Sequence, residues 1–213
     1  MASDQSIAAF VEALGSSAPA PGGGAASALA GALAAALAEM VARFTVGREK
    51  YRDVEERATA ILSQAEGARA TLLALAEDDA RAYQDVSAAY RLPRASDEER
   101  AAREEAIQAA LASAMQPPLR AVRAACATVG LAAEIAAIGN GTVISDAGCA
   151  ALLGEAAARA AALNVLANAT LLRDAALADG ARAEVRALLA EAQAQRDRAF
   201  ATTLRRMGVE ALS

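Results

Sequence analysis

Apolar positions recur at helical spacing along most of this chain. They first form a short amphipathic segment over residues 7–14, and then a segment over residues 25–44 that is apolar on every side. A helix that is apolar all round lies inside a bundle. From Gly23 to Ala35, every fourth residue is small, which predicts close approach by another helix. The pattern therefore predicts packed helices from the start of the chain.

A third helix is predicted from about Tyr51 to Tyr90, because its apolar positions alternate between spacings of three and four. One inward-facing position, Asp79, is a carboxylate, whereas Glu77 and Asp78 fall on other faces of the helix. The predicted stripe consists of Val54, Ala58, Ile61, Ala65, Ala68, Leu72, Leu75, Asp79, Tyr83, Val86 and Tyr90.

Capping and helix-breaking residues divide the next part of the chain. Ser96 and Glu99 have the spacing of a capping box and predict the start of a fourth helix. Pro117 and Pro118 are expected to separate it from a fifth, because proline interrupts a helix interior. The glycine-rich segment 139–141 should end the fifth helix.

Two further helices complete the predicted fold. Ser145 and Asp146 are expected to cap a long, buried helix over 147–174, and a helix with a polar face over 181–207 should cover the bundle. We therefore expect an all-α antiparallel bundle of about seven helices, forming a single domain over residues 1–213.

The composition supports helices and narrows the partners. Only 3% of the 213 residues are aromatic, and strands favour aromatic and β-branched side chains. The net charge is -5, without a long run of Lys or Arg, so nucleic acid is not an expected partner. The segment 25–44 is mostly alanine and carries Glu39 and Arg43, which favours a buried helix over a membrane span. The N-terminus lacks the pattern of a signal peptide, so we expect a cytoplasmic protein.

The chain contains no histidine, so the commonest general base and the commonest metal ligand are absent. Proton transfer would fall to a carboxylate, Tyr, Lys or Cys, and no metal site is expected. Cys126 and Cys149 lack CxxC spacing, and we interpret them as reduced thiols in a helical core.

Asp79 is the leading catalytic candidate. A carboxylate within an apolar stripe loses hydration, and this raises its pKa towards the range useful for proton transfer. A structural hydrogen bond or an Arg partner would explain a buried Asp equally well. Tyr83 lies one turn further on and could share a hydrogen bond with Asp79, or could simply belong to the core.

Two groups of residues could bind a ligand near such a carboxylate. The segment 22–24 is three glycines before a helix, so free backbone N–H groups could receive a carbonyl, carboxylate or phosphate, although a tight turn explains it as well. Asn164 and Asn168 lie one turn apart on an apolar helix, where unpartnered amides cost about 1–3 kcal/mol. Helix contacts or a ligand ring could satisfy them.

A basic cluster stands out in this acidic chain. Arg43, Arg48, Lys50 and Arg52 lie close together, and Lys50 is the only lysine. An anionic group could dock there, but a solvated loop with surface ion pairs is an equally good interpretation.

Five segments, in this order, resemble the cyclodeaminase/cyclohydrolase family over nearly the whole chain. That family comprises the C-terminal domain of formiminotransferase-cyclodeaminase and stand-alone bacterial methenyltetrahydrofolate cyclohydrolases. The segments are APAPGGGAAS at 18–27, TVGREKY at 45–51, DDARAY at 78–83 with RLP at 91–93, GNGTVISDAG at 139–148, and ALNVLANA at 162–169.

The resemblance implies a homodimer of helical bundles that binds folate in a cleft near the subunit interface. It implies that Asp79 is the catalytic residue, in agreement with the stripe, and that Arg48 and Lys50 meet the glutamate tail. It needs no cofactor or metal. The implied substrate-binding residues are Pro21, Gly22, Gly23, Gly24, Ser27, Arg48, Lys50, Tyr83, Asn140, Ser145, Asp146, Asn164 and Asn168.

Three functions follow as alternatives. The run ALNVLANA and the absence of a formiminotransferase half favour a cyclohydrolase, which converts 5,10-methenyltetrahydrofolate into 10-formyltetrahydrofolate in one-carbon metabolism. A formimidoyltetrahydrofolate cyclodeaminase, which releases ammonia, is the nearest alternative. A non-catalytic adaptor that self-associates through the small-residue strip is a third.

Overall fold

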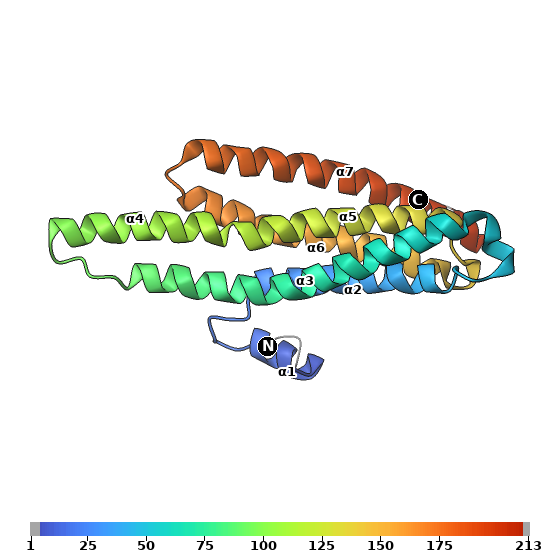
Figure 1. The fold of residues 1–213 in the computed structure, drawn as a ribbon, viewed down its shortest axis with the longest axis horizontal. Helices are drawn as coiled ribbons and strands as arrows, with labels where there is room; N and C mark the ends of the chain where they lie inside the picture. The colour runs from blue at the N-terminus through green and yellow to red at the C-terminus, as the bar shows by residue number, and fades with distance from the viewer. Residues whose placement is uncertain (1–4, 211–213) are drawn as a thin grey trace.

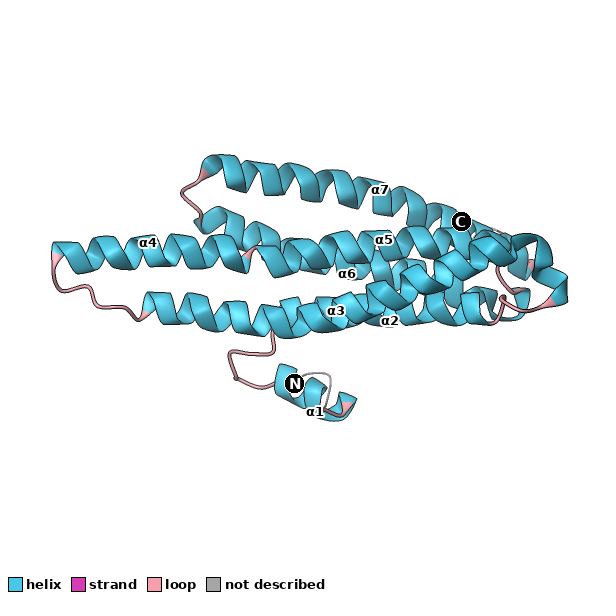
Figure 2. Ribbon diagram, in the orientation of Figure 1, coloured by secondary structure: helices cyan, strands magenta, loops and turns pink. Residues whose placement is uncertain are grey.

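The computed structural model describes residues 5–210, and within them it contains helices and no strand (Figures 1 and 2). The all-α prediction is confirmed. Seven α-helices and two 3-10 helices follow one another along this part of the chain. They are α1 Ile7–Leu14, α2 Gly23–Arg43, η2 Glu49–Val54, α3 Glu55–Tyr90, α4 Asp97–Ala114, α5 Gln116–Ile138, η3 Gly141–Val143, α6 Ile144–Leu171 and α7 Ala175–Met207.

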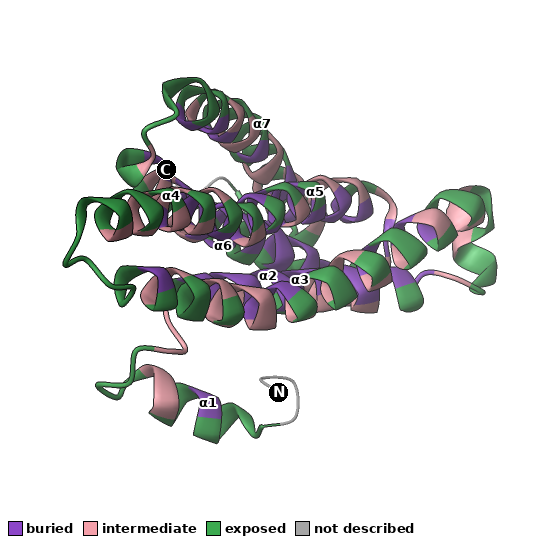
Figure 3. Cartoon of the chain, turned by 60° about the vertical axis from the view of Figure 1, so that its left-hand side comes forward, coloured by how far each residue is buried: buried purple, intermediate pink, exposed green. Residues whose placement is uncertain are grey.

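Helices α2, α3, α5 and α6 form the centre of the bundle and share one large core (Figures 1 and 3). Helix α7 packs on α5 and α6, as expected of an outer helix, and α4 continues the line of α5 alongside α3. The short α1 lies beside the start of α2 and contributes the buried Phe10. Much of the core is alanine, so neighbouring helix backbones lie close together.

The small-residue strip of α2 is used inside the chain. A Cβ added at Gly31 would lie 3.1 Å from Cδ2 of Leu72 in α3 and 3.6 Å from Cβ of Ala157 in α6. Ser27 and Ala35 are buried on the same side of α2. The strip therefore joins α2 to its own neighbours, and our adaptor alternative, which used it for self-association, is wrong about this surface.

The two prolines start α5 instead of forming a connection before it. Helices α4 and α5 meet directly at Met115, and Pro117 and Pro118 occupy the first turn of α5, where a missing N–H costs least. Pro118 nevertheless cannot donate to the carbonyl of Ala114, four residues earlier. Instead, Nδ2 of Asn168 in α6 donates to that carbonyl at 3.3 Å. The α4–α5 junction thus depends on a side chain from another helix.

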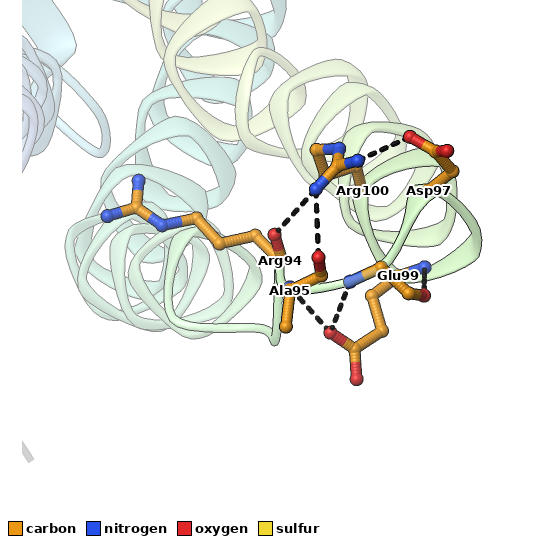
Figure 4. A network of polar contacts seen from close by, with 6 residues as sticks. Arg94, Ala95, Asp97, Glu99 and Arg100 are labelled. Carbon is orange, nitrogen blue, oxygen red and sulfur yellow. Dashed lines mark hydrogen bonds and ion pairs between the residues drawn. The ribbon is translucent and has the colours of Figure 1, made fainter.

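The connection from α3 to α4 has the predicted capping box. The hydroxyl of Ser96 accepts from the backbone N–H of Glu99 at 3.1 Å, and the Glu99 carboxylate accepts from the N–H of Ser96 at 3.2 Å. Arg100 donates to the carbonyls of Arg94 and Ala95 and pairs with Asp97 (Figure 4). These contacts fix the end of the bundle at which α3 turns into α4.

Several predicted helix ends differ from the structure. Residues from Glu49 to Val54 form η2, because Tyr51 is held by tertiary hydrogen bonds to Asn140 and Gly141, at 3.3 and 3.2 Å. Ser145 and Asp146 do not cap α6 but lie inside its first turn, because the helix already begins at Ile144.

Helix α7 starts at Ala175, earlier than predicted. The Asp174 side chain accepts from the N–H of Leu177 at 3.0 Å and caps the helix. The residue that we assigned to the end of α6 therefore belongs to the start of α7, because a carboxylate fits the free N–H groups of a helix start.

Three helical segments are long and apolar enough to cross a membrane by length and composition alone: Gly23–Arg43, Asp97–Ile138 and Gly141–Leu171. About half of each such stretch is buried inside the bundle. In the first of them, Glu39 is buried and accepts hydrogen bonds from Arg43 at 3.0 Å and Arg69 at 2.7 Å. Packing against other helices accounts for much of the apolar surface.

Candidate active site

A cleft of about 340 Å³ opens where the start of α2 meets α3, α4 and the last turns of α6. Asp79 and the glycine segment lie in its wall, together with the two asparagines of α6. Its lining consists of Pro19, Ala20, Gly22, Gly23, Gly24, Asp79, Ala80, Ala82, Tyr83, Val86, Leu111, Ala114, Asn164, Ala167, Asn168 and Leu171.

The Asp79 carboxylate lies at the N-terminus of α2. It accepts a hydrogen bond from the backbone N–H of Ala25, one of the donors that a helix start leaves free. A methyl group at Gly24 would overlap the carboxylate, so only glycine allows this approach. Asp78, its neighbour in sequence, points elsewhere and pairs with Arg81 and Arg120. As predicted, Asp79 faces inward and Asp78 does not.

Burial raises the pKa of the Asp79 carboxyl group above its ordinary value. The hydrogen bond from Ala25 acts in the opposite direction, because it favours the charged form, but it is the smaller effect. Among the described residues, no basic side chain forms an ion pair with Asp79 that would lower this pKa. Asp79 is therefore a half-buried carboxylate, open to a cleft, with a raised proton affinity.

The two asparagines face the cleft from α6, as predicted from their spacing. Nδ2 of Asn164 donates to the carbonyl of Ala160 at 3.1 Å, and Nδ2 of Asn168 donates to that of Ala114 at 3.3 Å. In both residues the donor group is used for structure. The side-chain carbonyl oxygens remain as acceptors for a ligand with N–H groups.

Tyr83 lines the cleft but is not a core residue, since 49% of it is exposed. Within residues 5–210 its hydroxyl forms no hydrogen bond, so the shared bond with Asp79 that we considered is absent from the structure. The aromatic ring offers an apolar surface beside the carboxylate instead.

Two predicted residues lie beside the cleft without lining it. Pro21 faces a second hollow, between α1 and α3, that also contains Phe10. The Ser27 hydroxyl is buried and donates to the carbonyl of Gly24 at 2.8 Å, so it supports the glycine segment from behind.

The other predicted residues lie at the opposite end of the bundle. Arg48 and Lys50 belong to the η2 region, which precedes α3, and about 24 residues of α3 at about 1.5 Å each place Asp79 about 36 Å away. Lys50 lies over the ring of Tyr51, 5.5 Å from its centroid.

The GNGTVISDAG segment is also at that far end. Asn140 donates through Nδ2 to the carbonyl of Phe44 at 2.9 Å and accepts from the N–H of Thr142 at 3.0 Å. Ser145 and Asp146 follow in the first turn of α6. One chain thus does not bring these three residues to the cleft, and Asn140 has a clear structural role.

The apolar wall of the cleft was not predicted. Leu111 and Ala114 come from α4, and Ala167 and Leu171 from α6, where they are ordinary members of Ala- and Leu-rich runs. No polar group marks them in the sequence. Only the tertiary arrangement places them opposite Asp79.

Other reactive groups lie elsewhere. Among the described residues there is no group of three or more His, Cys, Asp or Glu side chains that could hold a metal ion. Both cysteines are free, but only Cys126 is buried, and our prediction of a buried Cys149 is wrong. Burial, with the nearby Glu191 and Glu155 carboxylates, raises the pKa of Cys126 to about 11. That thiol is therefore a packing residue.

Fold and site together define a class: an all-α bundle with a half-buried carboxylate at a helix N-terminus, facing a cleft with amide acceptors and an apolar wall. Comparison with known proteins is more specific. The sequence model of the family described as Formiminotransferase-cyclodeaminase matches residues 6–187. The chain therefore belongs to this family, as its sequence segments indicated.

Individual relatives cover most of the chain. A methenyltetrahydrofolate cyclohydrolase from Methylorubrum extorquens is 45% identical over 202 residues, which are 95% of this chain and 97% of that protein. The formimidoyltransferase-cyclodeaminase of Rattus norvegicus is 34% identical over 192 residues, but they span only 36% of its length. The crystal structure of formiminotetrahydrofolate cyclodeaminase from Thermotoga maritima superimposes with a TM-score of 0.85 at 30% identity and covers 95% of this chain and 97% of that one.

Proposed function

We propose that this protein is a methenyltetrahydrofolate cyclohydrolase, which hydrolyses 5,10-methenyltetrahydrofolate reversibly to 10-formyltetrahydrofolate. The single observation that carries this proposal is 45% identity to a protein of that name over nearly the full length of both chains. The cleft supports it, because a carboxylate with raised pKa faces a space that holds several ring-sized groups.

The proposed chemistry needs one proton acceptor and a site that tolerates positive charge. Water attacks the methenyl carbon between N5 and N10 of the cationic substrate, and Asp79 accepts the proton from this water. The C–N5 bond of this adduct then breaks as its hydroxyl group gives up the second proton of the water and N5 takes one up, so that the formyl group stays on N10 and one proton is released overall. While ionised, Asp79 also attracts the cationic ring, and more strongly in a partly dry cleft than in water.

The walls of the cleft suit a pterin ring. The Oδ1 atoms of Asn164 and Asn168 are free to accept from its N–H groups, while the free N–H groups at the start of α2 can donate to its carbonyl. Tyr83 and Leu111 provide apolar surface for the aromatic parts of the substrate. We propose Gly22, Gly23 and Gly24 as part of this binding site.

Formimidoyltetrahydrofolate cyclodeaminase is the second candidate. The Thermotoga maritima protein of that name has about the same length as this chain, so chain length does not separate the two activities. The higher identity to the cyclohydrolase favours hydrolysis.

The two activities are distinguished by their substrates. Purified protein should accelerate the loss of methenyl absorbance at neutral pH, in a buffer whose slow uncatalysed hydrolysis is subtracted. With 5-formiminotetrahydrofolate it should release little ammonia. Ammonia release that is faster than methenyl hydrolysis would assign the protein to the cyclodeaminases.

We also propose a cytoplasmic homodimer with a single domain per chain. Large apolar side chains of α2 and α6, among them Leu33 at 52% and Leu163 at 69% exposed, point out of the bundle. The two helices are adjacent and antiparallel, because Gly23 lies next to Asn164 and Gly31 next to Ala157. An apolar face over two such helices fits a second copy.

A further inference from the structure

None of the described residues that line the cleft is basic, yet the proposed substrate carries a glutamate with two carboxylates. Arg48 and Lys50 lie about 36 Å from Asp79 within the chain, by the length of α3. We propose that Arg103 in α4 binds the glutamate tail instead. This inference rests on the proposed function, since it concerns the same substrate.

Contacts with Tyr90, at the end of α3, hold Arg103 in position. Its Nε and Nη2 atoms donate to the carbonyl of Tyr90 at 3.3 and 3.0 Å, and its guanidinium lies 5.7 Å from the centroid of the Tyr90 ring. Within residues 5–210 no carboxylate lies within ion-pair distance of it. A positioned, half-buried guanidinium with unused donors is suited to a carboxylate.

A continuous face of α3 leads from the reacting end of the cleft to this guanidinium. Asp79, Tyr83, Val86 and Tyr90 follow at spacings of four, three and four, so they lie on one side of the helix. The first three line the cleft, and Tyr90 is the next residue along the same face. Eleven residues separate Asp79 from Tyr90, a distance of about 16 Å. An extended aminobenzoyl-glutamate arm spans a gap of this order.

Arg103 also lies on the appropriate side of α4. Ala114, which lines the cleft, follows it by eleven residues, or about three turns, so both side chains have nearly the same direction. Ala89, Ile107 and Leu111 fill the centre of the contact between α3 and α4, so the arm would run along its exposed edge, past the rings of Tyr83 and Tyr90.

Several acidic groups near this end are already engaged, whereas Glu98 and Glu105 form no ion pair among the described residues. Glu104 pairs with Arg173 at 2.9 Å, Asp97 pairs with Arg100, and Glu99 serves the capping box. Arg94 forms no ion pair among the described residues, and its side chain extends away from α4 (Figure 4). The pairing of Glu104 with Arg173 therefore leaves the charge of Arg103 available to an anion.

The test compares two substrates in two variants. Methenyltetrahydrofolate carries the glutamate, whereas methenyltetrahydropteroate lacks it and keeps the reacting ring. Arg103→Ala should raise KM for the first about tenfold, the order expected for loss of a charge-assisted hydrogen bond, with little change in kcat. KM for the second should be unchanged. Arg100→Ala is the matched control, because Arg100 is on the same helix but already paired with Asp97; it should alter neither value.

An equal rise in KM for both substrates would show that Arg103 only supports the α3–α4 turn, and an unchanged KM for the glutamylated substrate would place the tail elsewhere. If Arg103→Ala does not fold, inhibition of the unmodified protein tests the same proposal. p-Aminobenzoylglutamate, which carries the glutamate, should compete with the substrate at a much lower concentration than p-aminobenzamide, which lacks it. Equal inhibition by the two compounds would overturn the proposal. A protein that is inactive on both substrates but binds them would instead contradict the proposed function.

Discussion

At the scale of single residues, Asp79 combines two opposed influences. Burial disfavours its charged form, whereas the start of α2 favours it through the N–H of Ala25. The pKa is raised overall, and the carboxylate still faces the cleft. A base in such a position can be ionised at neutral pH and still accept a proton readily.

Asp79→Asn should remove most activity, because the amide cannot accept the proton from water. We expect a loss of about 10²–10⁴-fold in kcat, measured by the decay of methenyl absorbance. In the unmodified enzyme kcat/KM should fall as the pH decreases through the raised pKa of Asp79, where the base becomes protonated. Turnover near the unmodified level in Asp79→Asn would refute the catalytic assignment.

Stability provides the control for this variant. A folded-state pKa above the unfolded value means that the folded protein binds more protons between the two values, so the stability contributed by Asp79 decreases as the pH rises through that window. Above the raised pKa the ionised group therefore lowers the stability of the folded protein. Asn removes the charge and keeps an acceptor for Ala25, so thermal unfolding at pH 7 should occur at an equal or higher temperature.

Gly24→Ala should displace the Asp79 carboxylate, since the added methyl group would overlap it. We expect a fall in kcat of at least about tenfold, from misplacement of the base. Gly67→Ala in α3 is the matched control, because no atom of the described residues lies within 4 Å of the new methyl group there. It should leave kcat unchanged and stabilise the helix slightly. Equal kcat values for both variants would show that the close approach has no catalytic role.

At the scale of the helices, the α4–α5 junction links folding to the site. Pro118 leaves the carbonyl of Ala114 without its helical donor, and Asn168 provides a replacement from α6. The same contact fixes the position of Asn168 in the cleft wall. A helix break and a binding residue therefore depend on one hydrogen bond.

Asn168→Ala should lower the free energy of unfolding by about 1 kcal/mol, the usual net value of such a bond. Denaturant titration measures this change. In a background with Pro118→Ala, which restores an N–H to the helix, the effect of Asn168→Ala should shrink. An undiminished effect in that background would mean that the carbonyl of Ala114 is not what Asn168 stabilises.

At the scale of the whole molecule, exposed apolar side chains of α2 and α6, among them Leu33 and Leu163, form the face that we propose for dimerisation. It continues to the edge of the cleft, because Leu163 lies next to Asn164 and α2 reaches the cleft through Gly23. A second copy on this face would limit solvent access to the site.

Leu33→Asp should shift the protein from dimer to monomer in sedimentation at micromolar concentration, because burying an unpaired carboxylate in an apolar interface is costly. Leu92→Asp is the control, since Leu92 is also exposed but lies at the end of α3, away from this face. It should leave the dimer intact. A dimer that persists in Leu33→Asp would place the interface elsewhere, and a protein that is monomeric without substitution would contradict the proposal.

Local patterns in the sequence were sufficient for the helices and for the direction of Asp79. Helical spacing depends only on neighbouring residues, so the all-α fold, the capping box at Ser96 and the shared face of Asn164 and Asn168 were predictable. Helix ends were less predictable from the sequence. The ends at Tyr51 and Asp174 depend on hydrogen bonds that the local pattern does not contain.

Only the tertiary structure decided which motifs meet. The glycines of α2, Asp79 and the two asparagines converge on one cleft, whereas Arg48, Lys50, Asn140, Ser145 and Asp146 lie at the other end of the bundle. It also turned the small-residue strip inward, left Cys149 exposed and gave Ala114 a partner from α6. The physical reason is that a helix fixes the direction of each side chain from its own sequence, while the opposing surface depends on how distant helices pack.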